Sequence, residues 1–203
     1  MDKLIIGVLS LALLVCICYI TYIHTIGTDK IKQNAILENI LNRKSVRNYI
    51  KGKEITEEQI NKILRAGMAA PSARNLQPWE FIVIKDRKTL ESLAQKSPYG
   101  KMLSDASAAI IVAGNLNTEG VSEFWIQDTS AVTENMLLEI EALGLGAVWI
   151  GGYPKEERTN MIKEELKLPK NIVPLNIISI GYPTGKDLPK DKWKPEKVHY
   201  EKY

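Results

Sequence analysis

Three cationic side chains and a hydroxyl lie within the five-residue run Arg43-Lys44-Ser45-Val46-Arg47. A phosphate monoester carries close to two negative charges, and an arginine guanidinium can bind it through two parallel donors. The same composition is also typical of a solvated, charged surface. The run is therefore a candidate phosphate-binding segment. Its residue types and their spacing do not exclude the alternative of a solvated, charged surface.

A second candidate segment lies between Pro71 and Pro78. Pro71 ends the helical pattern before it, because proline lacks an N–H and its ring clashes with the preceding turn. The side chains of Ser72, Asn75 and Gln77 follow, and an amide side chain offers both a donor and an acceptor to a ligand. The alternative is a polar helix-to-strand loop that binds nothing.

The stretch from Ala70 to Phe81 resembles the flavin-contacting loop of the nitroreductase family. The family pattern is A-P-S-x-x-N-x-Q-P-W-x-F, and each of its defined positions is present. The cationic run is similar to the family's R-R-S-x-R, and a third similarity covers 135–138 and 143–151. The three similarities occur in the family's order, and together they cover residues 36–203.

The resemblance implies an FMN site and assigns its residues. Arg43, Lys44, Ser45 and Arg47 would bind the phosphate and ribityl chain, with Lys192 near the C-terminus completing the phosphate site. The ring-contacting residues would be Pro71, Ser72, Asn75 and Gln77, in some members from the neighbouring subunit, and the backbone amides of Gly151 and Gly152. Lys44 stands where the family has arginine, and it keeps the charge but loses the planar fork.

The function implied by the resemblance is that of an FMN-dependent oxidoreductase. It would use NADH or NADPH to reduce nitroaromatics, quinones or flavins by a ping-pong hydride transfer. No nucleophile–base pair or carboxylate dyad stands out, so no catalytic side chain is assigned and the cofactor carries the chemistry. Two alternatives stay open: a reductive dehalogenase of the same fold, and a membrane-tethered flavin-binding or redox-sensing module without turnover.

Composition narrows the class of protein further. A net charge of +3 over 203 residues, without a basic run interleaved with aromatics, argues against a nucleic-acid partner. His24 and His199 lie far apart and belong to no ligand-spaced cluster, so no metal site is expected. Cys16 and Cys18 both lie in the N-terminal apolar run, where they cannot crosslink the remainder of the chain.

The N-terminal run from Leu4 to Ile26 contains no charged residue. At about 1.5 Å per residue it is long enough to cross a hydrocarbon core of about 30 Å as a helix. A cleavable signal peptide is the alternative, but no small-x-small cleavage site follows the run. We therefore expect a single-pass anchor over residues 1–28 and an FMN-binding domain over 29–203. The Lys and Arg residues that follow the run predict a cell-membrane protein whose catalytic domain faces the cytoplasm.

Hydrophobic periodicity predicts alternating helices and strands after residue 29. We expect helices over 31–41, 56–70, 125–143 and 155–166, and strands over 79–84, 108–113, 148–150 and 173–180. Asp86 is expected to cap a further helix that contains Leu90 and Leu93, and Thr56 with Gln59 predicts a capping box at the start of the helix over 56–70. The residues Ala131, Met136, Leu137, Ile140 and Leu143 are the expected inward positions of the longest helix. The resemblance narrows this pattern to the nitroreductase-like α+β fold, with a central, mostly antiparallel sheet flanked by helices. It also implies an intertwined homodimer. The polar tail from Pro183 is either disordered or an arm on another surface, and its aromatic residues, which need apolar surface to bury against, favour an arm on the partner subunit.

Overall fold

The computed structural model describes residues 13–22, 35–118, 120 and 123–203. Its internal contacts divide the chain into two units, Met1–Leu41 and Asn42–Tyr203. Helices cover residues 13–22 and 35–42 near the N-terminus. The predicted domain boundary after residue 28 lies outside the described residues and stays a prediction.

The predicted membrane localisation is wrong. In the part of the chain that the structure describes, no helix has the length and apolarity that a membrane crossing requires. Of the predicted anchor, the structure describes residues 13–22, which are helical. The rest of the predicted anchor, residues 1–12 and 23–28, lies outside the described residues.

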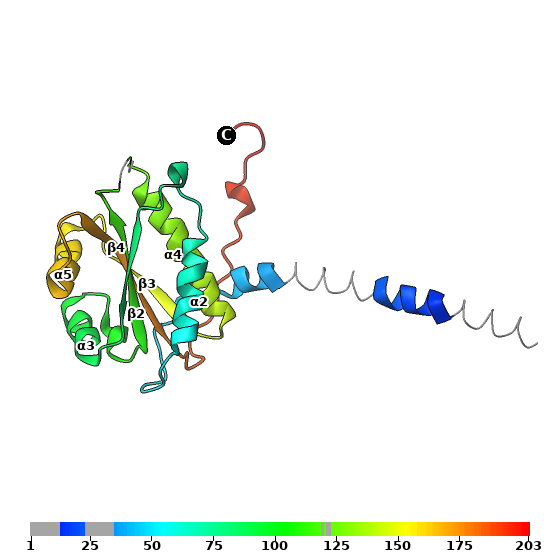
Figure 1. Ribbon diagram of the computed structural model, residues 1–203, viewed down its shortest axis with the longest axis horizontal. Coiled ribbons are helices and arrows are strands. Elements are labelled where there is room, and N and C mark those ends of the chain that lie inside the picture. The colour runs from blue at the N-terminus through cyan, green and yellow to red at the C-terminus, as the bar shows by residue number, and fades with distance from the viewer. Residues whose placement is uncertain (1–12, 23–34, 119, 121–122) are drawn as a thin grey trace, which may run out of the picture. The chain divides into compact units, whose positions relative to one another are not determined.

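The second unit is built around a four-stranded sheet with the strand order β1-β2-β4-β3 (Figure 1). The strands are β1 (Trp79–Ile84), β2 (Ala108–Asn115), β3 (Gly146–Gly151) and β4 (Ile172–Gly181). Every neighbouring pair is antiparallel. The central strands β2 and β4 have almost continuous apolar sequences because both of their faces are covered. The predicted α+β fold with an antiparallel sheet flanked by helices is thus confirmed.

Two helices cover each face of the sheet (Figure 1). On one face, α2 (Glu57–Met68) and α4 (Trp125–Ala142) pack on alternate strand residues such as Ile110 and Ile178. On the other face, α3 (Arg87–Lys96) and α5 (Glu156–Leu166) pack with the residues between them, such as Ile111 and Ile177. Short 3-10 turns lie at η1 (Ala73–Asn75), η2 (Lys101–Ser104) and η3 (Pro195–Lys197).

The helix ends follow their local sequence signals. Thr56 and Gln59 form the predicted capping box at the start of α2, which ends at Met68 rather than Ala70, ahead of Pro71. Asp86 caps α3 by accepting a hydrogen bond from the Thr89 amide at 2.8 Å. Of the inward positions predicted for α4, Met136, Leu137 and Ile140 are buried, whereas Ala131 and Leu143 are partly buried.

The cationic run 43–47 lies along the open edge of β3, the last strand of the sheet. Ser45 forms a parallel bridge with Ala147, and the Val46 amide donates to the Ala147 carbonyl at 2.8 Å. This close approach requires Gly146, because a Cβ there would lie 2.6 Å from Cγ1 of Val46. The buried Tyr49 hydroxyl, 2.9 Å from the Val46 carbonyl and 3.0 Å from the Ser179 carbonyl, holds the far end of the segment. Burial raises the pKa of Tyr49.

Candidate cofactor site

A cation-rich groove of about 600 Å³ lies where the run 43–47 meets the start of the C-terminal tail. Its lining contains six cationic side chains and a single carboxylate, that of Asp187. The lining residues are Arg43, Lys44, Ser45, Arg47, Lys186, Asp187, Leu188, Pro189, Lys190 and Lys192. Such a donor set is suited to a phosphate group.

The cations of the run 43–47 differ in their partners. Arg43 forms an ion pair with Glu134 at 3.2 Å, and Lys44 forms one with Glu141 at 2.7 Å. The Arg47 guanidinium has no carboxylate partner among the described residues and makes only a 3.5 Å contact with the Ser45 carbonyl. Arg47 is therefore the cation of this run that is available to an anionic ligand.

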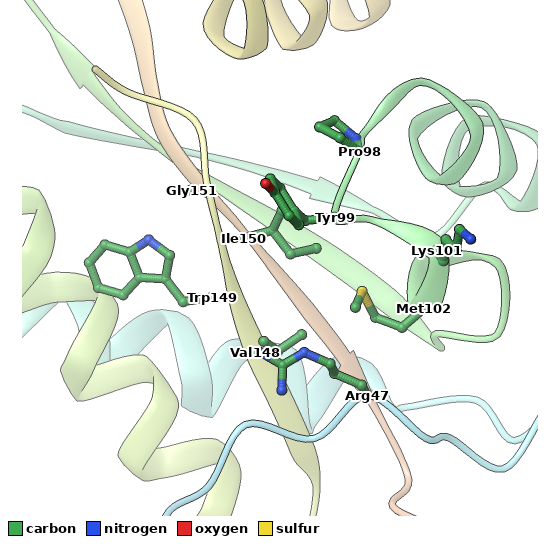
Figure 2. A pocket seen from close by; sticks show the side chains of 9 residues that line it. All are labelled: Arg47, Pro98, Tyr99, Lys101, Met102, Val148, Trp149, Ile150 and Gly151. Carbon is green, nitrogen blue, oxygen red and sulfur yellow. The ribbon is translucent and has the colours of Figure 1, made fainter. Parts of the chain in front are cut away.

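A second cavity, of about 500 Å³, opens beside β3 (Figure 2). Its walls come from β3, from the segment between α3 and η2, from the start of η2, and from Arg47. The lining residues are Arg47, Pro98, Tyr99, Lys101, Met102, Val148, Trp149, Ile150 and Gly151. Val148 and Ile150 point to one side of β3, and Trp149 points to the other (Figure 2). The cavity combines apolar walls with two cations. Such a lining is suited to a flat aromatic ligand that has polar atoms at its edges.

The two predicted glycines have different environments. Gly151 lines the cavity, and a Cβ added there would meet no atom within 4 Å. Gly152 is buried, its amide donates to the Leu175 carbonyl at 2.9 Å, and a Cβ would lie 3.2 Å from Ile162. Only Gly151 thus presents its backbone to the cavity, whereas Gly152 permits close packing beneath it.

Arg47 lines both the groove and the cavity. A single elongated ligand can therefore reach from one to the other past this side chain. An anionic group at one end and a flat ring at the other would match the two linings.

The loop 71–77 has an unusual backbone. Arg74, Asn75 and Gln77 have φ values of 55°, 57° and 50°, a conformation that is costly for residues other than glycine. The Ser72 hydroxyl accepts from the Gln77 amide at 3.0 Å, and the Gln77 side chain donates to Asn75 at 2.9 Å. Such conformations persist only where the surroundings impose them, and they cluster at ligand-binding sites.

Two contacts from outside the loop hold it. The buried carboxylate of Asp128, on α4, accepts a hydrogen bond from the Ala73 amide at 3.0 Å. The Arg74 guanidinium donates to the Gly120 carbonyl. Within the described part of the chain, the loop lines neither the groove nor the cavity.

The structure thus gathers most, but not all, of the site residues predicted from the sequence. The four residues Arg43, Lys44, Ser45 and Arg47 share the groove with Lys192, and Gly151 lies in the adjoining cavity. The loop residues Pro71, Ser72, Asn75 and Gln77 are separate from them.

The prediction from the sequence did not include several residues that line the groove and the cavity. Lys190 precedes Lys192 by two positions, and in an extended tail such residues share one side, which is a signal that could have found it. Tyr99, Lys101 and Met102 lie in a short polar turn whose local sequence gives no such signal. The local sequence around Asp128 gives no signal either, because its hydrogen-bond partner, the Ala73 amide, lies 55 positions away.

Comparison with known proteins identifies the class. The model of the nitroreductase family matches residues 40–102 and 96–182. A protein of Methanothermobacter thermautotrophicus, provisionally named NADH dehydrogenase/NAD(P)H nitroreductase, is 41% identical over 86% of this chain and 91% of its own. The chain belongs to the nitroreductase family.

Solved structures agree with this assignment. A protein of Bacteroides thetaiotaomicron with the same provisional name is 47% identical and superposes with a TM-score of 0.79, covering 83% of this chain and 98% of its own. A nitroreductase from Desulfovibrio desulfuricans, provisionally so named and solved in complex with FMN, is 30% identical with a TM-score of 0.71, covering 83% of this chain and 97% of its own. The predictions of the family, of an oxidoreductase, and of FMN with NADH or NADPH are confirmed at the level of the family.

The residues present fit FMN. The groove offers cations for a phosphate, the cavity offers apolar walls for a ring, and the open Cβ position at Gly151 lets a ring approach the backbone. Beside residues 148–151, no described strand covers the second edge of β3, so backbone groups there remain available to a ligand.

Proposed function

We propose that this chain binds FMN and transfers electrons from NADH or NADPH to nitroaromatics, quinones or flavins in a ping-pong sequence. The observation that carries the proposal is that Arg47 lines both the cation-rich groove and the cavity beside β3. Bound FMN supplies the redox chemistry, and the protein binds and orients it.

The groove would bind the FMN phosphate. Arg47 would donate to the phosphate or the adjoining ribityl chain, with Lys190 and Lys192 contributing charge from the tail. Arg43 and Lys44, already paired with carboxylates, would contribute less binding energy than Arg47. Ser45 adds a hydroxyl at the same edge.

The cavity would hold the isoalloxazine ring. Its apolar side chains exclude water from one side, and the backbone at Gly151 can approach a ring edge. Lys101, with Arg47, would favour electron-rich ring oxygens by placing positive charge beside them. No side chain of the chain is required as an obligatory general acid.

We also propose a homodimer in which the loop 71–77 of one subunit covers the cavity of the other. The loop is rigidly held yet lines neither cavity of its own chain, which supports this arrangement. In the C-terminal tail, Trp193 is 72% and Tyr200 is 85% exposed, and aromatic side chains of this kind are commonly buried at interfaces.

Steady-state kinetics tests the reaction. The full chain with FMN should oxidise NADH or NADPH in the presence of a quinone or a nitroaromatic, and double-reciprocal plots at several acceptor concentrations should be parallel. Absence of FMN-dependent oxidation would refute the activity, and intersecting plots would refute the ping-pong sequence.

Complementation tests the shared site. Arg47→Ala and Asn75→Ala variants, each impaired alone, would form heterodimers with one intact site when co-expressed. Activity should then recover to about a quarter of the wild-type level, because random pairing makes half of the dimers mixed. No recovery would show that each site is built from a single chain.

A further inference from the structure

The start of the C-terminal tail is tied to residues 48–50, which directly follow the cationic run 43–47, by a short antiparallel pairing. Tyr49 bridges Pro183, the Ile50 amide donates to the Tyr182 carbonyl at 2.8 Å, and the Thr184 amide donates to the Asn48 carbonyl at 3.0 Å. No described backbone hydrogen bond continues this pairing beyond Thr184. The tail nevertheless stays beside the groove, where Lys190 and Lys192 line it.

The Asp187 side chain supplies the missing connection. Its Oδ2 atom accepts from the backbone amides of Arg47 at 3.2 Å and Asn48 at 3.3 Å, and from the Asn48 side-chain amide at 3.2 Å. One carboxylate oxygen thus joins the tail to the residue that lines both cavities, although the two segments lie 140 positions apart in the sequence.

A carboxylate is an unexpected component of a groove suited to phosphate. Among the described residues that line the groove, Asp187 is the only acid beside six cations, and its charge would repel a phosphate. No lysine or arginine forms an ion pair with it among the described residues. Its three contacts are instead to amide groups, which points to a positioning role rather than to charge neutralisation.

We propose that Asp187 is a positioning residue for the cofactor phosphate. By fixing the tail to the Arg47 and Asn48 backbone, it holds Lys190 and Lys192 in the groove. The same contacts fix the position of the Arg47 backbone. This inference rests on the proposed FMN function and adds a residue that does not itself touch the cofactor.

The direction in which a substitution changes FMN affinity distinguishes a positioning role of Asp187 from an effect of its charge. If only charge mattered, replacing Asp187 by alanine would remove a repulsion and strengthen FMN binding. If positioning dominates, the same replacement frees the tail and weakens binding. An asparagine side chain retains an oxygen acceptor without the charge, so Asp187→Asn should preserve the tether.

The test measures FMN and riboflavin dissociation constants by flavin fluorescence for the apo form of the full chain. Riboflavin lacks the phosphate and reports on the ring cavity alone. Asp187→Ala should weaken FMN binding at least about tenfold, as expected for losing three hydrogen bonds to amide groups, and leave riboflavin binding unchanged. Asp187→Asn should bind FMN about as well as the wild type.

Asp191→Ala is the matched control. Asp191 carries the same charge in the same tail. Among the residues that the structure describes, its carboxylate accepts only from the Trp193 amide, at 2.9 Å, and it does not line the groove. FMN binding to Asp191→Ala should be unchanged or slightly stronger. Trypsin cleavage after Lys190 and Lys192 should accelerate in Asp187→Ala and not in Asp187→Asn.

Each result of these binding measurements either supports or overturns the inference. Unchanged or tighter FMN binding by Asp187→Ala overturns it, as does an equal loss of FMN and riboflavin binding, which would indicate general destabilisation. A tenfold loss in Asp187→Asn also overturns it, because the tether would then depend on charge. A wild-type chain without FMN affinity would refute the proposed function first, and this inference with it.

Discussion

Replacing Asp128 by alanine should open the loop 71–77 while leaving the rest of the domain folded. Asp128 is 7% exposed, and its carboxylate accepts the Ala73 amide at 3.0 Å. The loop holds three non-glycine residues at φ values of 50–57°, each of which costs about 1–3 kcal/mol. It therefore depends on its external hydrogen bonds to stay in this conformation.

The expected magnitude follows from that hydrogen bond. A hydrogen bond to a charged group contributes about 1.5–3 kcal/mol, so its loss should raise the open fraction of the loop by about 10- to 150-fold. The change in global stability should be smaller, because the alanine variant also avoids the cost of burying a carboxylate. Asp128→Asn keeps a neutral oxygen acceptor, so it should open the loop less than Asp128→Ala does.

Limited trypsin digestion measures this opening directly. Arg74 lies in the loop, and cleavage after it reports the open population when opening and closing are fast. Lys167, at the end of α5, provides a reference site in the same molecule whose cleavage should not change. Cleavage after Arg74 at the wild-type rate in Asp128→Ala would refute the claim that this carboxylate holds the loop.

Three further predictions concern the edge of β3. Arg47→Ala should weaken FMN binding by about 10- to 150-fold. Lys44→Ala should have a much smaller effect, because Lys44 is already paired with a carboxylate at 2.7 Å. Equal losses of FMN affinity in a fluorescence titration would contradict this. Gly146→Ala places a Cβ 2.6 Å from Val46 and should lower thermal stability by about 1–3 kcal/mol, which an unchanged melting temperature would contradict. Because burial raises the pKa of Tyr49 in the folded state, the unfolded state loses that proton first, and the free energy of unfolding should be maintained below about pH 10 and fall above it. Denaturant titrations should show a shallower alkaline fall for Tyr49→Phe, and an identical fall would refute this attribution.

Local features were predictable where a few neighbouring residues determine the structure. The bounds of β1 match the prediction, because an apolar run between Pro78 and a capping aspartate leaves little choice. The capping box of α2 and the Asp86 cap of α3 were likewise evident from residues three positions apart.

Features that depend on distant contacts were not predictable. The tether between Asp187 and the Arg47 amide joins residues 140 positions apart, and the local sequence around neither residue indicates the other. The cavity beside β3 takes Tyr99 and Met102 from a short turn whose position depends on the packing of α3 and β3. The membrane prediction failed in a different way, because it used apolar composition and length alone, whereas no helix among the described residues has the length and apolarity of a membrane span.

The most direct test of the account is an absorbance spectrum of the purified full chain, recorded without oxygen before and after addition of NADH or NADPH. The account predicts the bands of bound flavin at about one FMN per chain, their bleaching by the nicotinamide, and their return when a quinone is added. A chain that stays colourless after incubation with excess FMN and removal of the unbound cofactor would contradict it.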